Sequence, residues 1–280
     1  MSKQEYRYAT SPEAFKNLTT EEIRRDYLIE SLFQDDKITA TYTAHDRMII
    51  LGARPIQHKL HLPTLEPLTK AEYFLQRREL GAINIGGPGT ITTDGTTHSV
   101  DNLECLYIGK GVRSVQFSSE DPNHPSEFYI NSCPAHAPYP TVLFKTDQAN
   151  QVHLGALETA NERTIYQFIH EKGIQSCQLV MGLTILKTGS VWNTFPPHTH
   201  HRRMEAYLYF NLPENNIVMH FMGDPAETRH IVVRNKQAII SPEWSIHSGA
   251  GTTNYTFIWG MAGENQAFTD MDPVNLTHLA

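Results

Sequence analysis

Three histidines and one glutamate are spaced as a set of metal ligands would be. His198 and His200 are two residues apart, Glu205 follows five residues after His200, and His247 lies downstream behind Pro242. Because alternate residues of a β-strand point to the same face, His198 and His200 can both face one interior from a single strand. Glu205 joins them if the next turn or strand returns over the same cavity. These ligands suit Zn²⁺, Fe²⁺, Mn²⁺, Ni²⁺ or Co²⁺, so the spacing predicts a metal site and leaves the metal open.

A chance cluster of histidines is the alternative. One buried histidine is more often a hydrogen-bonded core residue than a ligand, and a lone His-x-His is a weak signal. The complete pattern of four residues favours the metal site. His201 could replace His200 as a ligand, but its side chain should face away from His198, so we interpret it as a polar residue at the rim.

Composition limits the class of protein. The chain has 280 residues, enough for one large or two small domains, and no apolar run approaches the roughly 20 residues that cross a bilayer. Three widely separated cysteines and a polar N-terminus predict a cytoplasmic protein with reduced thiols. A net charge of -7 argues against nucleic acid as a partner but leaves room for an anionic small substrate held by a few arginines.

The elements that must position these residues are mostly strands. The first forty residues look helical, with an N-cap at Ser11 before Pro12 and helical spacing over 20–29. Many short strands with turn signals between them indicate sandwiches or barrels. They are expected at 38–43, 47–51, 82–85, 178–185, 206–210, 217–221, 230–233 and 255–259, with a hairpin over 90–98 around Asp94-Gly95. A proline-rich connector at 132–140 places a boundary between about 140 and 175, which gives domains 1–150 and 151–280.

A faint internal repeat links the two halves. Residues 77–79 (Arg-Arg-Glu) echo residues 202–205 (Arg-Arg-Met-Glu). If Glu79 corresponds to Glu205, one of the two histidine positions is Phe74, which cannot ligate a metal. The N-terminal half is then expected to be a duplicate without a metal site.

Long motifs carry a resemblance to a known family. The histidine pattern is similar to the two halves of the cupin metal signature, with Gly189 ahead of it and Trp244 where that signature usually has glycine. The longer motifs are FLQRRELG (74–81), LYIGKG (106–111), ETRHIV (227–232), ISPEWSIHSG (240–249) and FIWGMAGEN (257–265). Together they resemble the 5-keto-4-deoxyuronate isomerases, also called 4-deoxy-L-threo-5-hexosulose-uronate ketol-isomerases, from about residue 27 to 272.

The resemblance implies a fold, an activity and an assembly. It implies a mainly β protein of two cupin-type β-barrels (a bicupin) with short helices and an N-terminal helical segment, assembled as a homohexamer. A Zn²⁺ site would lie in the C-terminal barrel, with His198, His200, Glu205 and His247 as ligands. The implied reaction interconverts 5-dehydro-4-deoxy-D-glucuronate and 3-deoxy-D-glycero-2,5-hexodiulosonate during the breakdown of pectin-type polyuronides.

Such an isomerisation needs a base near carbon and stabilisation of an enediolate. Glu205 is the first candidate for the base, although a fixed role as ligand is an equal alternative. Glu243, His201 and Tyr255 are lesser candidates.

The substrate carboxylate needs a cationic group, and arginine suits it by its bidentate geometry. The candidates are Arg163, Arg202, Arg203 and Arg229, with Lys187 behind them, and a surface salt bridge is the ordinary alternative for each. Two other functions stay open: a cupin dioxygenase with iron and O₂, and a non-catalytic sugar-binding bicupin whose metal only stabilises the fold.

Overall fold

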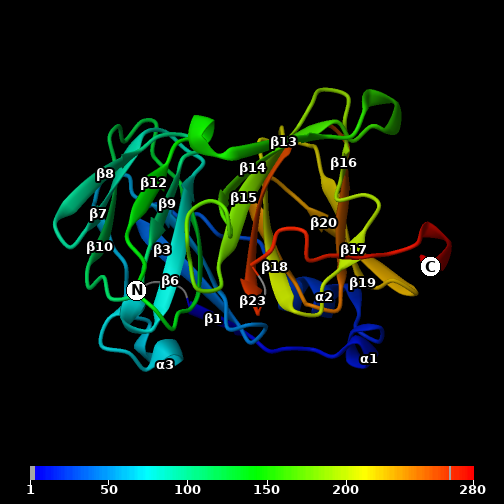
Figure 1. The fold of residues 1–280 in the computed structure, drawn as a ribbon, viewed down its shortest axis with the longest axis horizontal. Coiled ribbons are helices and arrows are strands. Elements are labelled where there is room, and N and C mark those ends of the chain that lie inside the picture. Colours follow the sequence, from blue (N-terminus) through cyan, green and yellow to red (C-terminus); the bar gives the residue numbers. More distant parts are fainter. Residues whose placement is uncertain (1–3, 265) are drawn as a thin grey trace. The chain divides into compact units, whose positions relative to one another are not determined.

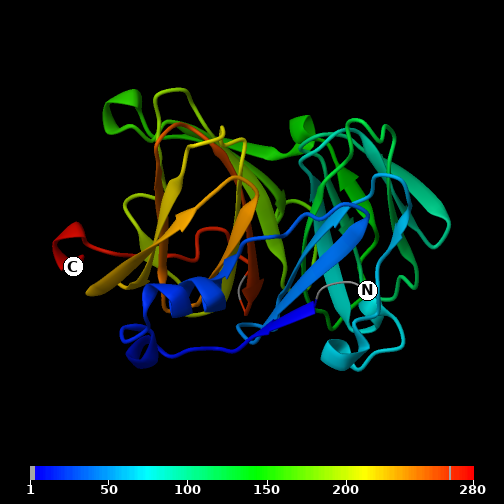
Figure 2. The same ribbon diagram turned by 180° about the vertical axis from the view of Figure 1, so that it is seen from behind.

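The chain divides into two compact units. A computed structural model describes residues 4–264 and 266–280 (Figures 1 and 2). Of these residues, unit 1 holds 4–6, 32–149 and 168–180, and unit 2 holds 7–31, 150–167 and the chain from 181 onward. The two units do not correspond to a single division of the chain at residue 150. Residues 7–31 belong to unit 2, and residues 168–180 belong to unit 1.

Unit 1 contains a larger and a smaller antiparallel sheet. The larger sheet has the strand order β1 (Gln4–Arg7), β3 (Lys37–Thr43), β4 (Ile49–Arg54), β11 (Phe128–Pro134), β6 (Arg78–Asn84), β9 (Cys105–Ile108) and β12 (Val142–Phe144). The smaller sheet has the order β5 (Leu60–His61), β10 (Val115–Ser119), β7 (Gly89–Thr93) and β8 (Thr96–Val100). Inward-facing residues such as Leu51, Leu106 and Phe117 form the apolar core.

Unit 2 repeats this strand order. Its larger sheet runs β13 (Asn150–Leu154), β14 (Arg163–Ile169), β15 (Val180–Leu186), β23 (Thr256–Gly263), β18 (Arg203–Phe210), β21 (Gln237–Ser241) and β2 (Leu28–Ile29). Its smaller sheet runs β16 (Trp192–Asn193), β22 (Ile246–Gly251), β19 (Val218–Asp224) and β20 (Glu227–Val233). A short ladder joins β17 (His198–Thr199) to β24 (Asp272–Pro273).

Helices are short. The α-helices are α1 (Pro12–Phe15), α2 (Thr20–Tyr27) and α3 (Glu66–Thr69), and the 3₁₀ turns are η1 (Phe74–Gln76), η2 (Thr146–Gln148), η3 (Leu157–Thr159) and η4 (Leu276–His278). Ser11 caps α1 as expected, and α2 begins with a capping box between Thr19 and Glu22. The expectation that the first forty residues are helical is too broad, because β1, β2 and part of β3 also lie there.

The mainly β prediction is confirmed, and strands stand at each of the expected positions. The hairpin of β7 and β8 turns at Asp94 and Gly95, whose φ angles are +46° and +89°. A two-residue turn of this hand fits the twist of the flanking strands, and Asp and Gly tolerate it best. No helix in the described ranges is both long and apolar enough to cross a membrane.

The internal repeat is real, but its register was wrong by one residue. Leu80 of β6 lies in the apolar core of unit 1, whereas Glu79 points to the other face. Since β6 and β18 hold the same place in their sheets, Arg78 corresponds to Arg203 and Leu80 to Glu205. A shift of one residue along a strand reverses the side that each residue faces.

Glu79 has a structural role instead. Its carboxylate is fully buried and accepts hydrogen bonds from the backbone N–H groups of Cys177, Gln178 and Leu179 at 2.7, 2.8 and 2.9 Å. The Tyr107 hydroxyl donates a fourth at 2.7 Å. Glu79 therefore holds residues 177–179 to the sheet of unit 1.

Candidate metal centre and ligand pocket

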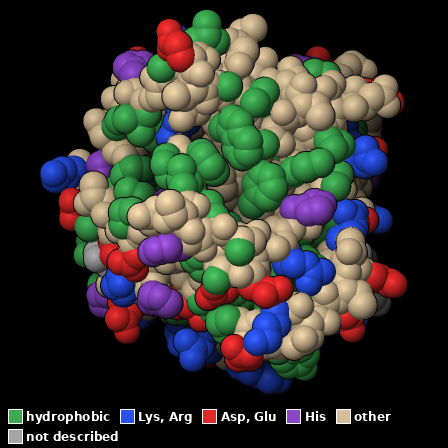
Figure 3. Space-filling model, turned by 90° about the vertical axis from the view of Figure 1, so that its right-hand side faces the viewer, with side chains coloured by type: hydrophobic (Ala, Val, Ile, Leu, Met, Phe, Trp, Pro, Cys, Tyr) green, Lys and Arg blue, Asp and Glu red, His purple; other side chains and the backbone are tan. Residues whose placement is uncertain are grey.

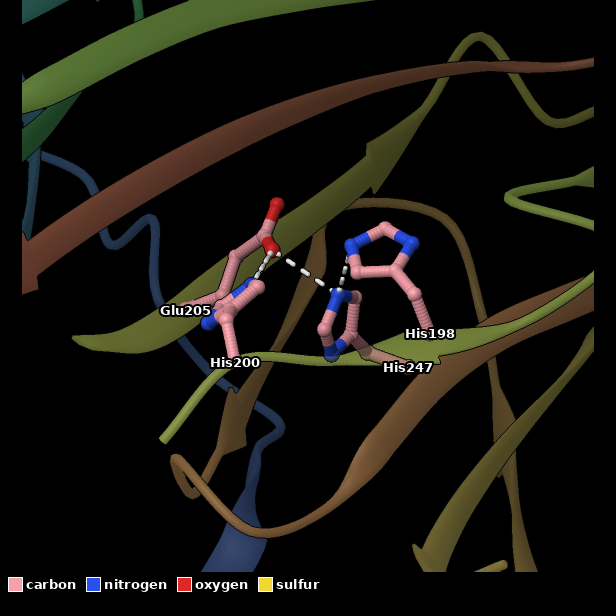
Figure 4. A group of neighbouring side chains, drawn as sticks. All are labelled: His198, His200, Glu205 and His247. Carbon is pink, nitrogen blue, oxygen red and sulfur yellow. Dashed lines mark hydrogen bonds and ion pairs between the residues drawn. The ribbon is translucent and has the colours of Figure 1, made fainter. Parts of the chain in front are cut away.

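The four predicted ligands come from one turn and three strands of unit 2, each strand belonging to a different sheet. His198 lies in β17, His200 in the turn that follows, Glu205 in β18 and His247 in β22 (Figure 4). The expectation that one strand presents both early histidines is thus only partly met, because β17 ends at Thr199. The turn bends back so that His200 still faces the same interior.

The ligand atoms of these four side chains converge. All lie within 4.8 Å of one another. Glu205 Oε2 is 3.1 Å from Nε2 of both His200 and His247, and Nε2 of His247 is 3.0 Å from Nε2 of His198 (Figure 4). Neighbouring ligands of a tetrahedral zinc ion with bonds of about 2.0–2.1 Å lie roughly 3.3 Å apart, so the spacing fits one small cation.

Backbone carbonyls fix which nitrogen of two rings is protonated. Nδ1 of His200 is 2.8 Å from the carbonyl oxygen of Arg203, and Nδ1 of His247 is 3.2 Å from that of Ser245. A carbonyl oxygen only accepts, so each Nδ1 carries the proton and each neutral ring has a bare lone pair on Nε2. The lone pair of His200 Nε2 and the Glu205 carboxylate oxygen, 3.1 Å apart, repel unless a proton or a metal ion lies between them. Ligating histidines in proteins are commonly held in this way.

Burial keeps the imidazoles of His198 and His247 in the ligating form. It lowers the pKa of His198 to about 4 and that of His247 well below its ordinary value, and the neighbouring histidines lower the latter further. A neutral imidazole is the form that binds a metal ion. The donor set, its spacing and its protonation therefore suit a divalent metal.

The departure at Trp244 has a local explanation. The cupin signature usually has glycine at this position, yet the turn from Pro242 to Ser245 still closes through a backbone hydrogen bond of 3.1 Å. The indole packs edge-on against Phe15 of α1 and donates to the Thr10 carbonyl oxygen at 3.1 Å. The N-terminal residues of unit 2 thus accommodate the larger side chain, and His247 keeps its place.

A pocket of about 230 Å³ opens beside the cluster. We call it the ligand pocket. His198 and Glu205 form part of its wall, and most of the remaining wall is apolar or aromatic, including Phe257, Trp259 and Phe268. Glu205 is the one carboxylate among the described residues that line it.

Arg163 is the predicted arginine that is best placed to meet an anion in the ligand pocket. It lies at the start of β14, lines the pocket and donates one hydrogen bond, from Nη1 to the Asn161 carbonyl oxygen at 2.8 Å. No ion pair links it to any residue in the described ranges. Desolvation lowers the pKa of Arg163, yet an arginine stays charged at neutral pH.

Arg203 also lines the pocket but is bound to the chain itself. Its side chain is 1% exposed and donates to the carbonyl oxygens of Ala267, Phe268 and Asp270 at 2.8, 3.3 and 3.0 Å. These bonds hold residues 266–271, which supply Phe268 and Met271 to the pocket wall. Arg203 thus shapes the pocket rather than offering a free charge.

The other predicted residues lie elsewhere. Arg202 pairs with Asp270 and Asp272, both at 2.7 Å, and Arg229 donates to backbone carbonyls of residues 16 and 18. Neither lines the pocket, and the same holds for Lys187, His201, Glu243 and Tyr255. Lys187 and His201 are exposed, whereas the Tyr255 hydroxyl is satisfied by Asn193 and two backbone carbonyls.

Sequence reasoning missed Tyr207. It follows Glu205 by two residues on β18, so strand alternation turns it into the same interior, and this spacing was the available signal. Its hydroxyl is 3.4 Å from Thr194 Oγ1. Burial and the nearby Glu205 carboxylate hold the pKa of Tyr207 well above its ordinary value, so it remains a hydrogen-bond donor.

A second, apolar pocket of about 240 Å³ lies on unit 2. Trp192, Phe195 and Phe221 line it together with Leu279. Hydrophobic side chains gather on the face shown in Figure 3, on the side of unit 2 where β16 and the C-terminal residues lie.

Known proteins resemble this chain in sequence, and solved structures resemble it in fold. The model of the KduI/IolB family matches residues 34–276. A 4-deoxy-L-threo-5-hexosulose-uronate ketol-isomerase of Formosa agariphila is 53% identical over 278 residues, which cover 99% of each chain. The protein of the same name of Lachnoclostridium phytofermentans is 54% identical over 275 residues, 98% of this chain and 99% of the relative.

Solved structures agree at the level of fold. An IolB-like protein of Salmonella typhimurium LT2 has a TM-score of 0.68 at 14% identity, covering 81% of this chain and 87% of its own. Oxalate decarboxylase of Bacillus subtilis has a TM-score of 0.56 at 8% identity, covering 80% and 71%. The fold and the site define a mainly β protein of the cupin type with a side-chain cluster that could bind a metal. The chain belongs to the KduI/IolB family.

Proposed function

We propose that this chain is a metal-dependent ketol-isomerase that converts 5-dehydro-4-deoxy-D-glucuronate to 3-deoxy-D-glycero-2,5-hexodiulosonate in the breakdown of pectin-type polyuronides. Near full-length relatives at about half identity bear the name of this isomerase. One observation carries the proposal. A largely buried cluster of three histidines and one glutamate borders a pocket that is also lined by Arg163, an arginine with no ion pair to any described residue.

Zn²⁺ is the proposed metal, one per chain, held by His198, His200, Glu205 and His247. When bound, a divalent ion polarises carbonyl and hydroxyl oxygens and stabilises the negative charge of an enediolate. The convergent Nε2 atoms and the Glu205 carboxylate support this ligand set.

Glu205 is the proposed base. It is the one carboxylate in the pocket wall, and only its Oε2 makes the close approaches to His200 and His247. A carboxylate in this position can take a proton from one carbon of the substrate and return it to the next. The Tyr207 hydroxyl, kept protonated, donates a hydrogen bond to a substrate oxygen.

Arg163 is the proposed partner of the substrate carboxylate. A guanidinium group binds a carboxylate through two parallel hydrogen bonds, and the apolar surroundings of Arg163 strengthen that attraction. Arg202, Arg203 and Arg229 already have partners within the chain, which makes them weaker candidates.

We further propose that the two units are cupin-type barrels, that unit 1 holds no metal, and that the chain works in the cytoplasm as a homohexamer. The corresponding strand order of the two units supports the first point, and Leu80 in the place of Glu205 supports the second. Free cysteines suit a reducing compartment. The hydrophobic side chains of Figure 3 supply a surface that assembly would bury.

The proposed function is tested by His247→Ala beside His201→Ala. His247→Ala should lose bound zinc and turnover of 5-dehydro-4-deoxy-D-glucuronate while keeping its circular dichroism spectrum. His201→Ala removes an exposed neighbour and should keep both. Full turnover in a folded, zinc-free His247→Ala protein would refute the proposed site. Oxygen consumption with bound iron would point to a dioxygenase instead.

A further inference from the structure

A pocket in unit 1 is lined by three arginines. It has a volume of about 240 Å³, close to the 230 Å³ of the ligand pocket in unit 2. Arg47 comes from the turn between β3 and β4, and Arg77 and Arg78 stand at the start of β6. We call it the arginine pocket.

Arg78 is a buried cation without a counter-ion. It is 7% exposed, and its Nε donates to Ser132 Oγ at 3.1 Å. Its Nη2 donates to the carbonyl oxygens of Arg47 and Ser132 at 2.6 and 2.7 Å. Within the described ranges, no residue hydrogen-bonds to Nη1 and no carboxylate contacts the guanidinium. Removing a charge from water costs free energy that an anion in the pocket would offset.

The other two arginines add to the same positive field. Arg47 is exposed, and its side chain has no hydrogen bond or ion pair with any residue that the structure describes. Arg77 is held in place by the carbonyl oxygens of Thr69 and Lys70, both at 2.8 Å from its Nη2. No acidic side chain occurs among the described residues that line this pocket. The site therefore favours an anion, and guanidinium groups match the geometry of a carboxylate.

The rest of the wall suits a carbon skeleton. Tyr42 and Phe74 line the pocket together with Leu68 and Pro134. Tyr42 is fixed by stacking on Tyr6, with ring centroids 5.1 Å apart and planes inclined by 13°. A bare inorganic ion would leave these apolar and aromatic surfaces uncovered, whereas an organic anion would cover them.

We propose that the arginine pocket binds a small sugar acid. Arg47 and Arg78 contact its carboxylate, and Tyr42 and Phe74 pack against its carbon skeleton. The size of the proposed ligand rests partly on the proposed function. The arginine pocket has nearly the same volume as the ligand pocket of unit 2, to which an acidic monosaccharide is assigned. Binding here adds a non-catalytic ligand site in the unit that lacks the histidine cluster.

The test is calorimetric titration of D-glucuronate into the zinc-supplemented full-length chain. An Arg163→Ala background removes the free guanidinium from the ligand pocket of unit 2. Arg47→Glu reverses one charge in the arginine pocket, and Arg113→Glu is the matched control, an exposed arginine of unit 1 outside that pocket. Inorganic phosphate serves as a second titrant.

Arg47→Glu should weaken glucuronate binding by about tenfold or more, and Arg113→Glu should change it by less than about twofold. Lack of saturable binding to the background protein overturns the proposal, as does equal binding by both variants. Phosphate binding without glucuronate binding overturns the assignment to a sugar acid. Arg47→Glu alone should leave turnover of the uronate unchanged. Turnover therefore tests the isomerase proposal, and glucuronate binding tests the arginine pocket.

Discussion

Arg203→Met should open the wall of the ligand pocket. The buried guanidinium of Arg203 makes three hydrogen bonds to the carbonyl oxygens of Ala267, Phe268 and Asp270. Hydrogen bonds to charged groups contribute about 1.5–3 kcal/mol each. Losing two of these bonds at the lower value already destabilises the closed position of residues 266–271 by about 3 kcal/mol, or roughly a hundredfold in the equilibrium between closed and open segments.

Two assays measure this opening. Because Phe268 and Met271 supply part of the pocket wall, kcat/KM for the uronate should fall by about ten- to a hundredfold. Limited proteolysis within 266–271 should become faster in proportion to the open fraction. Arg202→Met is the control, because its ion pairs are partly exposed and its loss should change both readouts by less than about twofold.

If Arg203→Met keeps kcat/KM and resists proteolysis as the parent protein does, Arg203 does not hold residues 266–271 in place. A rise in KM without faster proteolysis would show that Arg203 contacts the substrate carboxylate directly. Equal losses in Arg202→Met and Arg203→Met would show that burial does not distinguish the two arginines.

Three further predictions concern stability, pH and substrate binding. Glu79→Ala should lower the free energy of unfolding, measured by denaturant titration, by at least about 3 kcal/mol. The reason is that three backbone N–H groups and the Tyr107 hydroxyl lose their acceptor. A loss below about 1 kcal/mol would contradict this prediction. Metal-free protein should melt at progressively lower temperature as pH falls from 6.5 toward 4. The pKa of His198 is about 4 in the folded chain and has its ordinary value in the unfolded chain, so the unfolded chain binds a proton first and is favoured as pH falls. A melting temperature that does not change over this pH range would contradict the prediction. Arg163→Lys keeps the charge but loses the bidentate geometry and should raise KM about tenfold, while Arg229→Lys should leave KM unchanged in the same assay.

The site was predictable where chemistry is encoded by local spacing. Strand alternation predicted that His198 and His200 face one interior, and both do, although His200 lies in the turn after β17 and not in the strand. The positions of the strands along the chain followed from β-rich runs separated by turn residues, as the Asp94-Gly95 hairpin illustrates. These signals are local in sequence, so they can be recognised without knowledge of tertiary contacts.

What could not be predicted depends on partners distant in sequence. Arg202 and Arg203 were candidates for the substrate carboxylate, with a salt bridge as the ordinary alternative, and the sequence did not show that their partners lie more than sixty residues downstream. Glu79 was matched to Glu205 by identity of residue type, and one step of register placed it on the opposite face. Its role as hydrogen-bond acceptor for residues 177–179 depends on the folded structure, because these residues lie far from Glu79 in the sequence.

The most direct test of the account is turnover of 5-dehydro-4-deoxy-D-glucuronate by the zinc-loaded protein, by the same protein after chelation, and after zinc is restored. We expect the 2,5-diulosonate to form with zinc, formation to stop on chelation and to recover when zinc is restored, with one metal bound per chain. Turnover that persists in the fully metal-free, folded protein, or its absence when the site is fully occupied, would contradict it.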